Sequence, residues 1–549
     1  MMTTKKYMNK VWLHLFTFLA FHLFILSPLP SSAQDSLLLR DYRFVKQQDK
    51  WLTHDNAAAL TRFSAKNIVE AEASLTKGNG GLVNYNDSRN TIDVNVGIES
   101  FYRLSKTVVG YGAISYNNWT GRDMTGSAFY ASCSTLLPFD LVEDSLTNPG
   151  KKHSDTYHLA GAIGVDVYHG ISLGARLDYT AANYAKYKDL RHKNKFMDLQ
   201  LSMGAYIPVT SWLKVGADYK YQRQSESLSF GTYGKSEKVY KTLIDYGAFM
   251  GMVEQFGNEG YTDKSREMPL IENRHGASVQ IAVDGSLSLF ASFGFMHGDG
   301  YYGRRSPYTI TYTNHERDSY GFQSQLSYAM RVSRHLLDFS FYSEKLNNNA
   351  NTFREMNNES GAAYYEYYDP VETGKKKLNV LSLLYRAQLH IHGELPTWEF
   401  AVGYNWTKRQ QTAYLYPYFR YQQLIVNRYS AEAVHNLVCR KGVWSFTLNA
   451  AYQKGSGNPC QDGSFIPTDN LQQPATMEAF LYREYQYLTA SQFTIGGSVK
   501  YAFVFPATRL KTYAKVAADY RKANDNAHMN ANLYGNDHVQ IALTLGCDF

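Results

Sequence analysis

Apolar and polar residues alternate along most of this chain, and this period of two limits its fold more than any other feature. The alternation is strict in residues 69–76, 92–99, 171–180 and 197–204, and it returns in many later segments. Successive side chains of a β-strand point to opposite faces of a sheet, so each segment has one apolar face and one polar face. Segments of about ten to fourteen residues with this pattern are typical of strands that cross a membrane as a β-barrel.

The connections between these segments separate a barrel from a soluble sandwich, whose strands also alternate. Tight links lie near residues 104–105, 169–170, 208–210, 284–285, 332–333, 394–396, 441–442 and 506–507. Between them lie longer polar or Tyr-rich stretches, near residues 78–90, 120–154, 183–194, 225–273, 299–316, 346–376, 411–427, 455–488 and 522–536. Short and long connections therefore follow one another in turn, as they do in outer-membrane barrels with short periplasmic turns and long extracellular loops.

We therefore predict an all-β fold for residues 67–549. It is a single transmembrane antiparallel up-and-down β-barrel with about 18 strands, within a range of about 16 to 20. Both ends of the chain are then expected on the periplasmic side.

The composition agrees with a barrel and excludes other classes of protein. The mean hydropathy of the 549 residues is −0.40, which is too low for a bundle of membrane-spanning helices. The net charge of +7 is mild, and no block of Lys and Arg predicts a nucleic-acid partner. The 45 Tyr residues suit the aromatic girdles at the two surfaces of a bilayer.

Residues 1–33 are expected to be a cleaved signal peptide. Three lysines, at positions 5, 6 and 10, precede a mostly apolar run over residues 11–26. Ser31 and Ala33 then provide the small residues of a secretory cleavage site before Gln34. We expect export across the inner membrane and location in the outer membrane, and an uncleaved anchor is the alternative.

The final strand carries the most specific single signal. Its alternate positions are apolar up to the last residue: Val539, Ile541, Leu543, Leu545, Cys547 and Phe549. The strand resembles the C-terminal signal that Gram-negative outer-membrane barrels present to the barrel-assembly machinery, with Phe549 as the insertion signal. The resemblance implies that outer-membrane lipid and that machinery are partners.

The polar face of each strand is expected to line the lumen. The candidate lumen-lining residues are Glu70, Glu72, Asp93, Glu99, Arg176, Asp178, Lys214, Asp218, Arg386, Glu399, Lys511 and Lys515. Their mixed signs allow cross-strand ion pairs that fill the interior, or an aqueous channel, and no ring of one sign selects between the two. The early strands are acidic and a late strand is basic, so the two groups are expected to neutralise each other where the barrel closes.

Residues 34–66 are apolar enough to pack but do not alternate, which makes them a candidate plug. The plug candidates are Trp51, Asp55, Asn56 and Leu60. The run from His54 to Leu60 resembles the Asn-Pro-Ala-Ala-Leu motif of fatty-acid-transporter-like barrels, although Ala57 replaces the proline. That resemblance implies a segment that folds into the lumen as a hatch. A periplasmic helix capped near Thr53 or Asp55 is the alternative.

The whole chain resembles uncharacterised outer-membrane β-barrel families, and that resemblance supplies no catalytic motif. No nucleophile elbow, Walker loop, HExxH or paired CxxC is present, so the sequence predicts no enzyme, cofactor or metal site. The cysteines are too few and scattered for a disulfide scaffold, although a bridge between Cys133 and Cys460 stays open.

We expect a channel or transporter that admits a polar or amphiphilic solute. The N-terminal segment and the long loops would gate it, with residues 225–273 as the favoured constriction or lid because of their length. One alternative is a non-conducting scaffold for a surface lipoprotein or another outer-membrane protein. The other is a barrel hydrolase with dispersed catalytic residues.

Overall fold

The computed structural model describes residues 38–549 apart from residues 48, 66, 131–135, 144–148, 233–239, 257–267, 468–472, 506–509 and 525–531. The predicted signal peptide, the tight link near residues 506–507 and Cys133 lie outside the described residues.

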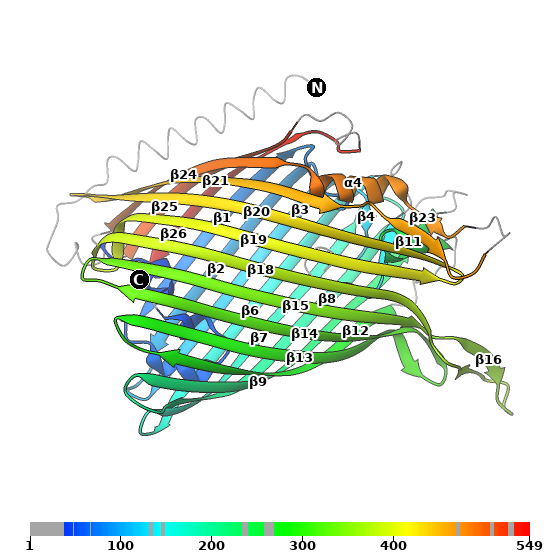
Figure 1. The fold of residues 1–549 in the computed structure, drawn as a ribbon, viewed down its shortest axis with the longest axis horizontal. Coiled ribbons are helices and arrows are strands. Elements are labelled where there is room, and N and C mark those ends of the chain that lie inside the picture. The colour runs from blue at the N-terminus through cyan, green and yellow to red at the C-terminus, as the bar shows by residue number, and fades with distance from the viewer. Residues whose placement is uncertain are drawn as a thin grey trace.

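Eighteen strands form one closed antiparallel barrel, which confirms the predicted fold class (Figure 1). Each strand pairs with its neighbour in the ring, and β1 pairs with β26 to complete it. The barrel strands are β1 (Ile68–Gly80), β2 (Asn90–Arg103), β3 (Val108–Met124), β6 (Gly150–Tyr168), β7 (Ile171–Lys186), β8 (Arg191–Pro208), β9 (Leu213–Gly231), β12 (Met268–Val283), β13 (Leu287–Ser306), β14 (Thr309–Ala329), β15 (Ser333–Ala350), β18 (Val371–His392), β19 (Leu395–Leu415), β20 (Tyr418–Cys439), β21 (Gly442–Gly457), β24 (Gln492–Phe505), β25 (Leu510–Ala523) and β26 (Asp537–Asp548).

The remaining elements precede the barrel or belong to its connections. They are α3 (Tyr42–Gln47), the 3-10 helices η1 (Lys50–Thr53) and η2 (Ala57–Arg62), β4 (Gly126–Ser127), β5 (Asp140–Glu143), β10 (Tyr240–Gly247), β11 (Met250–Phe256), β16 (Phe353–Asn357), β17 (Ala363–Tyr367), β22 (Gln461–Ser464), β23 (Ala475–Thr476) and α4 (Glu478–Thr489). Within the described part of the chain, no helix has the length and apolar character that would let it span a bilayer.

The wall of the barrel is inverted relative to a soluble protein, because its apolar face points outward. On β12, Val279 and Ile281 are 58% and 45% exposed, while the alternate residues Ser278 and Gln280 are buried inside. Only a hydrocarbon environment makes such a band of exposed apolar side chains stable around a whole barrel. The chain is therefore an outer-membrane barrel, as the sequence predicts.

Three of the nine expected long loops are short turns instead. Residues 187–190 join β7 to β8, residues 307–308 join β13 to β14, and residues 416–417 join β19 to β20. Strands of up to 22 residues continue their pairing well past the roughly 9–11 residues that a tilted strand needs to cross a bilayer. Beyond the bilayer neither face touches lipid, so the alternation stops while the hydrogen-bonded pairing goes on.

Phe549 extends the ladder that closes the barrel. Its backbone N–H donates to the carbonyl of Val69 at 3.0 Å, and the N–H of Val69 donates to the carbonyl of Phe549 at 2.8 Å. Phe549 is 47% exposed. The last residue thus joins the first strand through its backbone and leaves its side chain accessible from outside.

We expect Phe549→Ala to lower the amount of assembled barrel in outer membranes, because the variant keeps the backbone pairing but lacks the terminal aromatic ring. The heat-modifiable fraction on unboiled gels measures assembly. Phe505→Ala is the matched control, since Phe505 is an exposed aromatic residue at the end of another strand. Equal assembly of both variants would contradict the assignment of Phe549 as the insertion signal.

Candidate functional site

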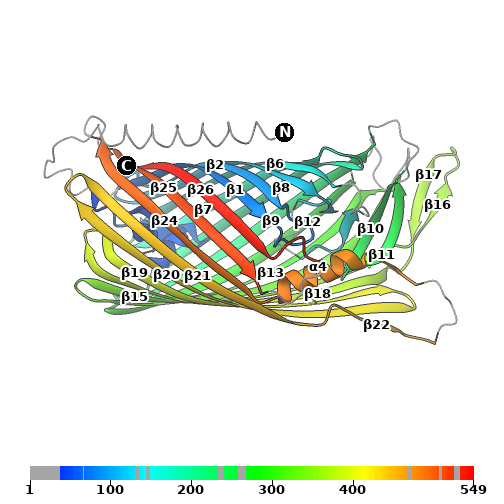
Figure 2. The same ribbon diagram turned by 90° about the horizontal axis from the view of Figure 1, so that it is seen from above.

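Residues 38–65, called here the N-terminal segment, lie inside one end of the barrel against its inner wall (Figures 1 and 2). The segment folds into α3, η1 and η2, and η2 contacts β3, β6, β7 and β8. The side chain of Asp49 caps η1 and that of Asn56 caps η2. A helix therefore does begin close to Asp55, with Asn56 as its cap, and it lies against the inner wall of the barrel.

Glycines in neighbouring strands let the backbone of η2 approach the wall closely. Gly164, Gly174 and Gly204 lie side by side on β6, β7 and β8. A Cβ atom added to Gly174 would lie 2.2 Å from the backbone nitrogen of Ala58, and one added to Gly164 would lie 2.6 Å from a backbone oxygen of the same helix. Glycine inside a strand weakens it, and such glycines often mark the close approach of another backbone. We call these three residues the glycine groove.

Asn56 anchors the segment at the edge of the glycine groove. It is fully buried, and its side-chain amide donates to Gln280 at 2.8 Å and to the backbone carbonyls of Ala205 and Ala217 at 3.0 and 3.3 Å. Its side-chain oxygen accepts from the N–H of Ala58 at 3.1 Å. A buried amide with these partners fixes the position of η2, because removing it would leave several of them unpaired.

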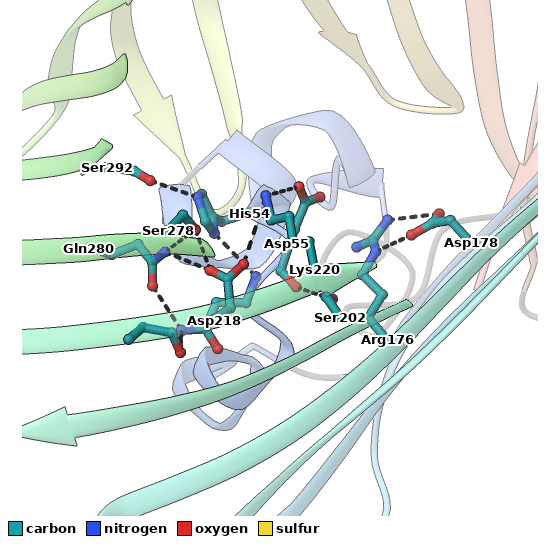
Figure 3. A network of polar contacts seen from close by, with 12 residues as sticks. His54, Asp55, Arg176, Asp178, Ser202, Asp218, Lys220, Ser278, Gln280 and Ser292 are labelled. Carbon is teal, nitrogen blue, oxygen red and sulfur yellow. Dashed lines mark hydrogen bonds and ion pairs between the residues drawn. The ribbon is translucent and has the colours of Figure 1, made fainter. Parts of the chain in front are cut away.

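A polar network continues from Asn56 into the wall (Figure 3). Lys220 donates to the carboxylate of Asp55 at 2.6 Å, and Ser202 donates to the carbonyl of Asp55 at 2.9 Å. The ring of His54 lies 2.9 Å from the hydroxyl of Ser292. Burial, together with the charge of Lys220, lowers the pKa of His54 to about 4, so this ring is neutral at pH 7. Asp55 and His54 thus attach the segment to three strands, through a charged contact on β9 and neutral contacts on β8 and β13.

Trp51 and Leu60 complete the set of plug candidates with apolar contacts. The indole of Trp51 packs edge-on against Tyr206 and Phe290, with ring centroids 5.3 and 5.0 Å apart. Leu60 is buried in a cluster with Phe101 of β2. All four candidates therefore contact the barrel wall.

Basic residues of the N-terminal segment pair with acidic residues of the wall around the lumen. The pairs are Arg40 with Glu394 at 3.3 Å, Arg43 with Glu399 at 3.1 Å, Lys46 with Glu99 at 2.7 Å, Lys50 with Asp338 at 3.5 Å and Arg62 with Asp284 at 3.2 Å. Most of these side chains are partly exposed, and such pairs contribute roughly 0.2–1 kcal/mol each. These ion pairs thus surround the segment, and each of them is weak by itself.

The lumen-lining candidates all point inward, but they do not converge on one site. Arg176 pairs with Asp178 at 2.5 Å, Arg386 with Glu399 at 3.2 Å and Lys214 with Asp284 at 3.8 Å, and Asp218 accepts a hydrogen bond from Gln280 at 2.6 Å. Asp93 accepts from Asn117 at 2.5 Å, and Glu70 and Glu72 accept from Tyr513. The expected neutralisation between early acids and late lysines is largely indirect, because Lys511 pairs with Asp548 at 3.5 Å and Glu99 with Lys46.

A cavity of about 550 Å³ lies between the N-terminal segment and the wall. Asp41 and Arg43 line it from the segment, and Glu72, Lys500 and Lys515 line it from the wall. Burial raises the pKa of Asp41, but the nearby Lys500 and Lys511 outweigh burial and hold that pKa below its usual value. The carboxylate of Asp41 is therefore charged, and the cavity offers groups of both signs.

A second obstruction lies at the other end of the barrel, and sequence reasoning missed it. The strands β23, β11, β10, β5 and β4 form a five-stranded sheet, called here the inner sheet, which contacts β18 and β19 from inside (Figure 2). One face packs on the wall through Ile244 and Tyr246, and the other packs on α4 through Leu243 and Phe249. Both faces of β10 are buried, so its sequence shows no alternation. Residues 225–273, expected as a lid, thus supply two strands of this sheet.

Side chains of the wall bind backbone carbonyls of the inner sheet and its flanking residues. Lys152 donates to the carbonyl of Ser127 at 2.8 Å, Arg317 to that of Leu136 at 2.7 Å and Lys376 to that of Leu137 at 2.9 Å. Arg420 donates to the carbonyl of Ala248 at 3.1 Å. The inner sheet is therefore attached to the wall by an apolar core and by several charged donors.

The family model with the description "Family of unknown function (DUF6850)" matches residues 57–549. The chain belongs to this family. That membership confirms the predicted place among uncharacterised outer-membrane barrel families. The matched residues include η2 and every barrel strand, so the family model spans both the docking helix and the wall that receives it. A search of the curated proteins finds no significant match.

Several solved structures are similar to this chain at low sequence identity. The alignment with the unliganded ferric citrate transporter FecA covers 88% of this chain and 78% of FecA, at 10% identity and a TM-score of 0.38. The alignment with BauA, the ferric preacinetobactin receptor from Acinetobacter baumannii, covers 88% of this chain and 80% of BauA, at 8% identity and a TM-score of 0.37. The alignment with the outer membrane transporter YddB from Escherichia coli covers 88% of this chain and 81% of YddB, at 8% identity and a TM-score of 0.38. At such scores the similarities carry no argument about mechanism.

We expect Gly174→Val to loosen the N-terminal segment, because the added side chain would overlap the backbone of Ala58. Overpacking of this kind typically costs about 1–3 kcal/mol, so trypsin should cleave the segment at least about fivefold faster. Gly321→Val is the matched control, since Gly321 faces the lumen from β14 and an added Cβ meets no atom within 4 Å. Equal cleavage in both variants would show that the glycine groove does not hold the segment.

Proposed function

We propose that this barrel is a channel for a small polar or amphiphilic solute, closed at rest by the N-terminal segment. The observation that carries the proposal is the open space between the two obstructions. Gly321 faces the lumen with no atom within 4 Å of an added Cβ, and the inward-facing Asp519 of β25 is only half-buried. A barrel of about this strand number leaves an aqueous channel unless something fills it.

The two obstructions differ in how they are held, and this difference supports the N-terminal segment as the gate. The segment is a single short stretch before the first barrel strand, and it is held by partly hydrated ion pairs, by Asn56 and by apolar clusters around Trp51 and Leu60. The inner sheet instead is built from three connections between barrel strands and buries two apolar faces, one against the wall and one against α4. Release of the segment leaves the barrel strands and their connections in place, so the segment is the part that can leave first.

The proposal needs no enzymatic step, cofactor or metal. The wall residues supply a polar path, and selection of the solute follows from the width of the path and from its mixed charges.

Planar bilayer recordings test the gate directly. We expect the intact protein to open rarely and a variant lacking residues 38–63 to conduct steadily, with an open probability at least about tenfold higher. A tenfold change corresponds to about 1.4 kcal/mol in the free energy that favours the closed state, and a few of the ion pairs of the segment would together supply that amount. Circular dichroism and heat-modifiable migration serve as controls for an intact barrel, and silence of both folded proteins would overturn the proposal.

A scaffold function is the second candidate, and the hairpin of β16 and β17 favours it. This hairpin projects beyond the barrel end, and its surface exposes Phe353, Tyr367 and the adjacent Tyr368 (Figure 1). Exposed aromatic rings of this kind suit a protein partner such as a surface lipoprotein. Removal of residues 353–367 should leave conductance unchanged, whereas it should abolish co-purification of any partner.

A further inference from the structure

A second cavity, of about 330 Å³, lies under the inner sheet and is called here the outer cavity. Five parts of the chain meet around it: the connection between β1 and β2, the residues before β5, the hairpin of β10 and β11, the wall strands β18 and β19, and α4. Its volume is at the lower end of the range of about 300–1,000 Å³ that holds small-molecule ligands.

The charged residues of the outer cavity do not balance. Arg409 is committed to Glu484 by two hydrogen bonds of 2.8 and 2.6 Å, so this pair adds no net charge. The remaining charged groups are the carboxylates of Asp87, Asp140 and Asp245 and the ammonium of Lys376. Asp87 is exposed, whereas Asp140, Asp245 and Lys376 are buried, so two buried acids against one buried base leave an excess of negative charge.

Among the described residues, the hydrogen-bond donors to these three carboxylates are neutral groups. Asp140 accepts from the hydroxyls of Ser127 at 2.6 Å and Tyr85 at 3.3 Å. Asp245 accepts from the backbone N–H of Gly247 at 2.9 Å, and Asp87 accepts from that of Asn84 at 3.3 Å. Neutral donors stabilise a buried carboxylate less than a cation does, so the cavity favours a ligand that brings a positive charge.

The protonation behaviour of these acids agrees with the missing positive charge. Burial raises the pKa of Asp245 to about 6, with Lys376 opposing the rise and Asp140 and Glu484 adding to it. Burial also raises the pKa of Asp140. Asp245 lies in the inner sheet and not in the membrane-spanning wall, and it is mostly ionised at pH 7.

We propose that the outer cavity binds a small hydroxylated primary amine, whose ammonium group lies between Asp140 and Asp245. The amide side chains of Asn84 and Gln411, which also line the cavity, are positioned to hydrogen-bond the hydroxyl groups of such a ligand. Within the described residues no three His, Cys, Asp or Glu side chains lie close enough together to hold one metal ion, which favours an organic cation. The inference rests on the proposed channel and names the class of solute that its outer end holds.

Calorimetric titration of the full chain in detergent tests this inference without any ion flux. The probes are 1-amino-1-deoxysorbitol and sorbitol, which differ by one amine in place of a hydroxyl. We expect the amine to bind at pH 7.5 and sorbitol to bind at least about tenfold more weakly, as one ion pair at an effective dielectric constant near 20 implies. Absence of amine binding, or equal binding of both probes, would overturn the inference.

Two substitutions with opposite expected effects guard against a simple loss of folding. Asp245→Asn should weaken binding of the amine about tenfold or more, whereas Lys376→Gln should strengthen it, because the negative excess grows. Asp519→Asn is the control, since Asp519 faces the lumen from β25 but does not line the outer cavity. Unchanged affinity in both Asp245→Asn and Lys376→Gln would place the amine elsewhere.

The pH dependence of binding gives an independent measurement. An alkyl ammonium group stays protonated between pH 5 and 7.5, as the reference pKa of about 10.4 for lysine shows. Asp245 gains a proton as the pH falls through about 6, so the amine should bind several-fold more weakly at pH 5 than at pH 7.5. Asp245→Asn should flatten this dependence, and a profile unchanged by that substitution would contradict the role of Asp245.

Failure of this inference and failure of the proposed channel are distinguishable. If the variant without residues 38–63 conducts but the protein binds no amine, the channel is supported and the proposed solute class is wrong. If the protein binds the amine at Asp245 but neither protein conducts, the binding site is supported and the proposed channel is wrong.

Discussion

Pairing between the first strand and the last is the interaction on which the rest of this structure depends. In hydrocarbon an unpaired backbone N–H or carbonyl costs several kcal/mol, roughly, so a sheet can span the bilayer only without an edge. The ladder from Glu70 with Asp548 to Gly80 with His538 removes that edge. Closure also fixes which face of each strand meets lipid. The charged side chains of the wall must then lie in the lumen or beyond the bilayer.

Closure creates a lumen that is too wide for the wall to fill, and the chain fills its two ends by different means. At one end η2 lies in a groove of glycines and basic side chains bind acidic ones. At the other end the inner sheet has two apolar faces, one against the wall and one against α4. The first arrangement combines fit and charge with apolar clusters around Trp51 and Leu60, while the second relies mainly on burial of apolar surface.

The sequence predicts the barrel far better than it predicts what lies inside. Alternation and turn spacing determine the fold class, because lipid imposes a period of two on each strand. Alternation does not predict β10 and β11, because β10 is buried on both faces. It also does not predict the strands around residues 307–308, because neither face of these strands touches lipid there. A signal for the docking site was present: Gly164, Gly174 and Gly204 interrupt three successive strands where larger residues would be more stable. It becomes meaningful only when the register places these residues side by side.

The charges show the same division between local pattern and three-dimensional placement. From the sequence, early acids and late lysines were expected to neutralise each other across the closing strands. In the structure, acids such as Glu99, Asp284 and Glu399 instead pair with basic residues of the N-terminal segment. Without the segment, these acids would keep only the basic partners of the wall, such as Arg386 for Glu399 and Lys214 for Asp284, so the net charge at this end would become more negative. A gate that supplies the countercharge of its own channel changes the selectivity of the path when it opens, because the opened lumen favours cations. The same sign prevails in the outer cavity, so both ends of the path favour a positively charged solute.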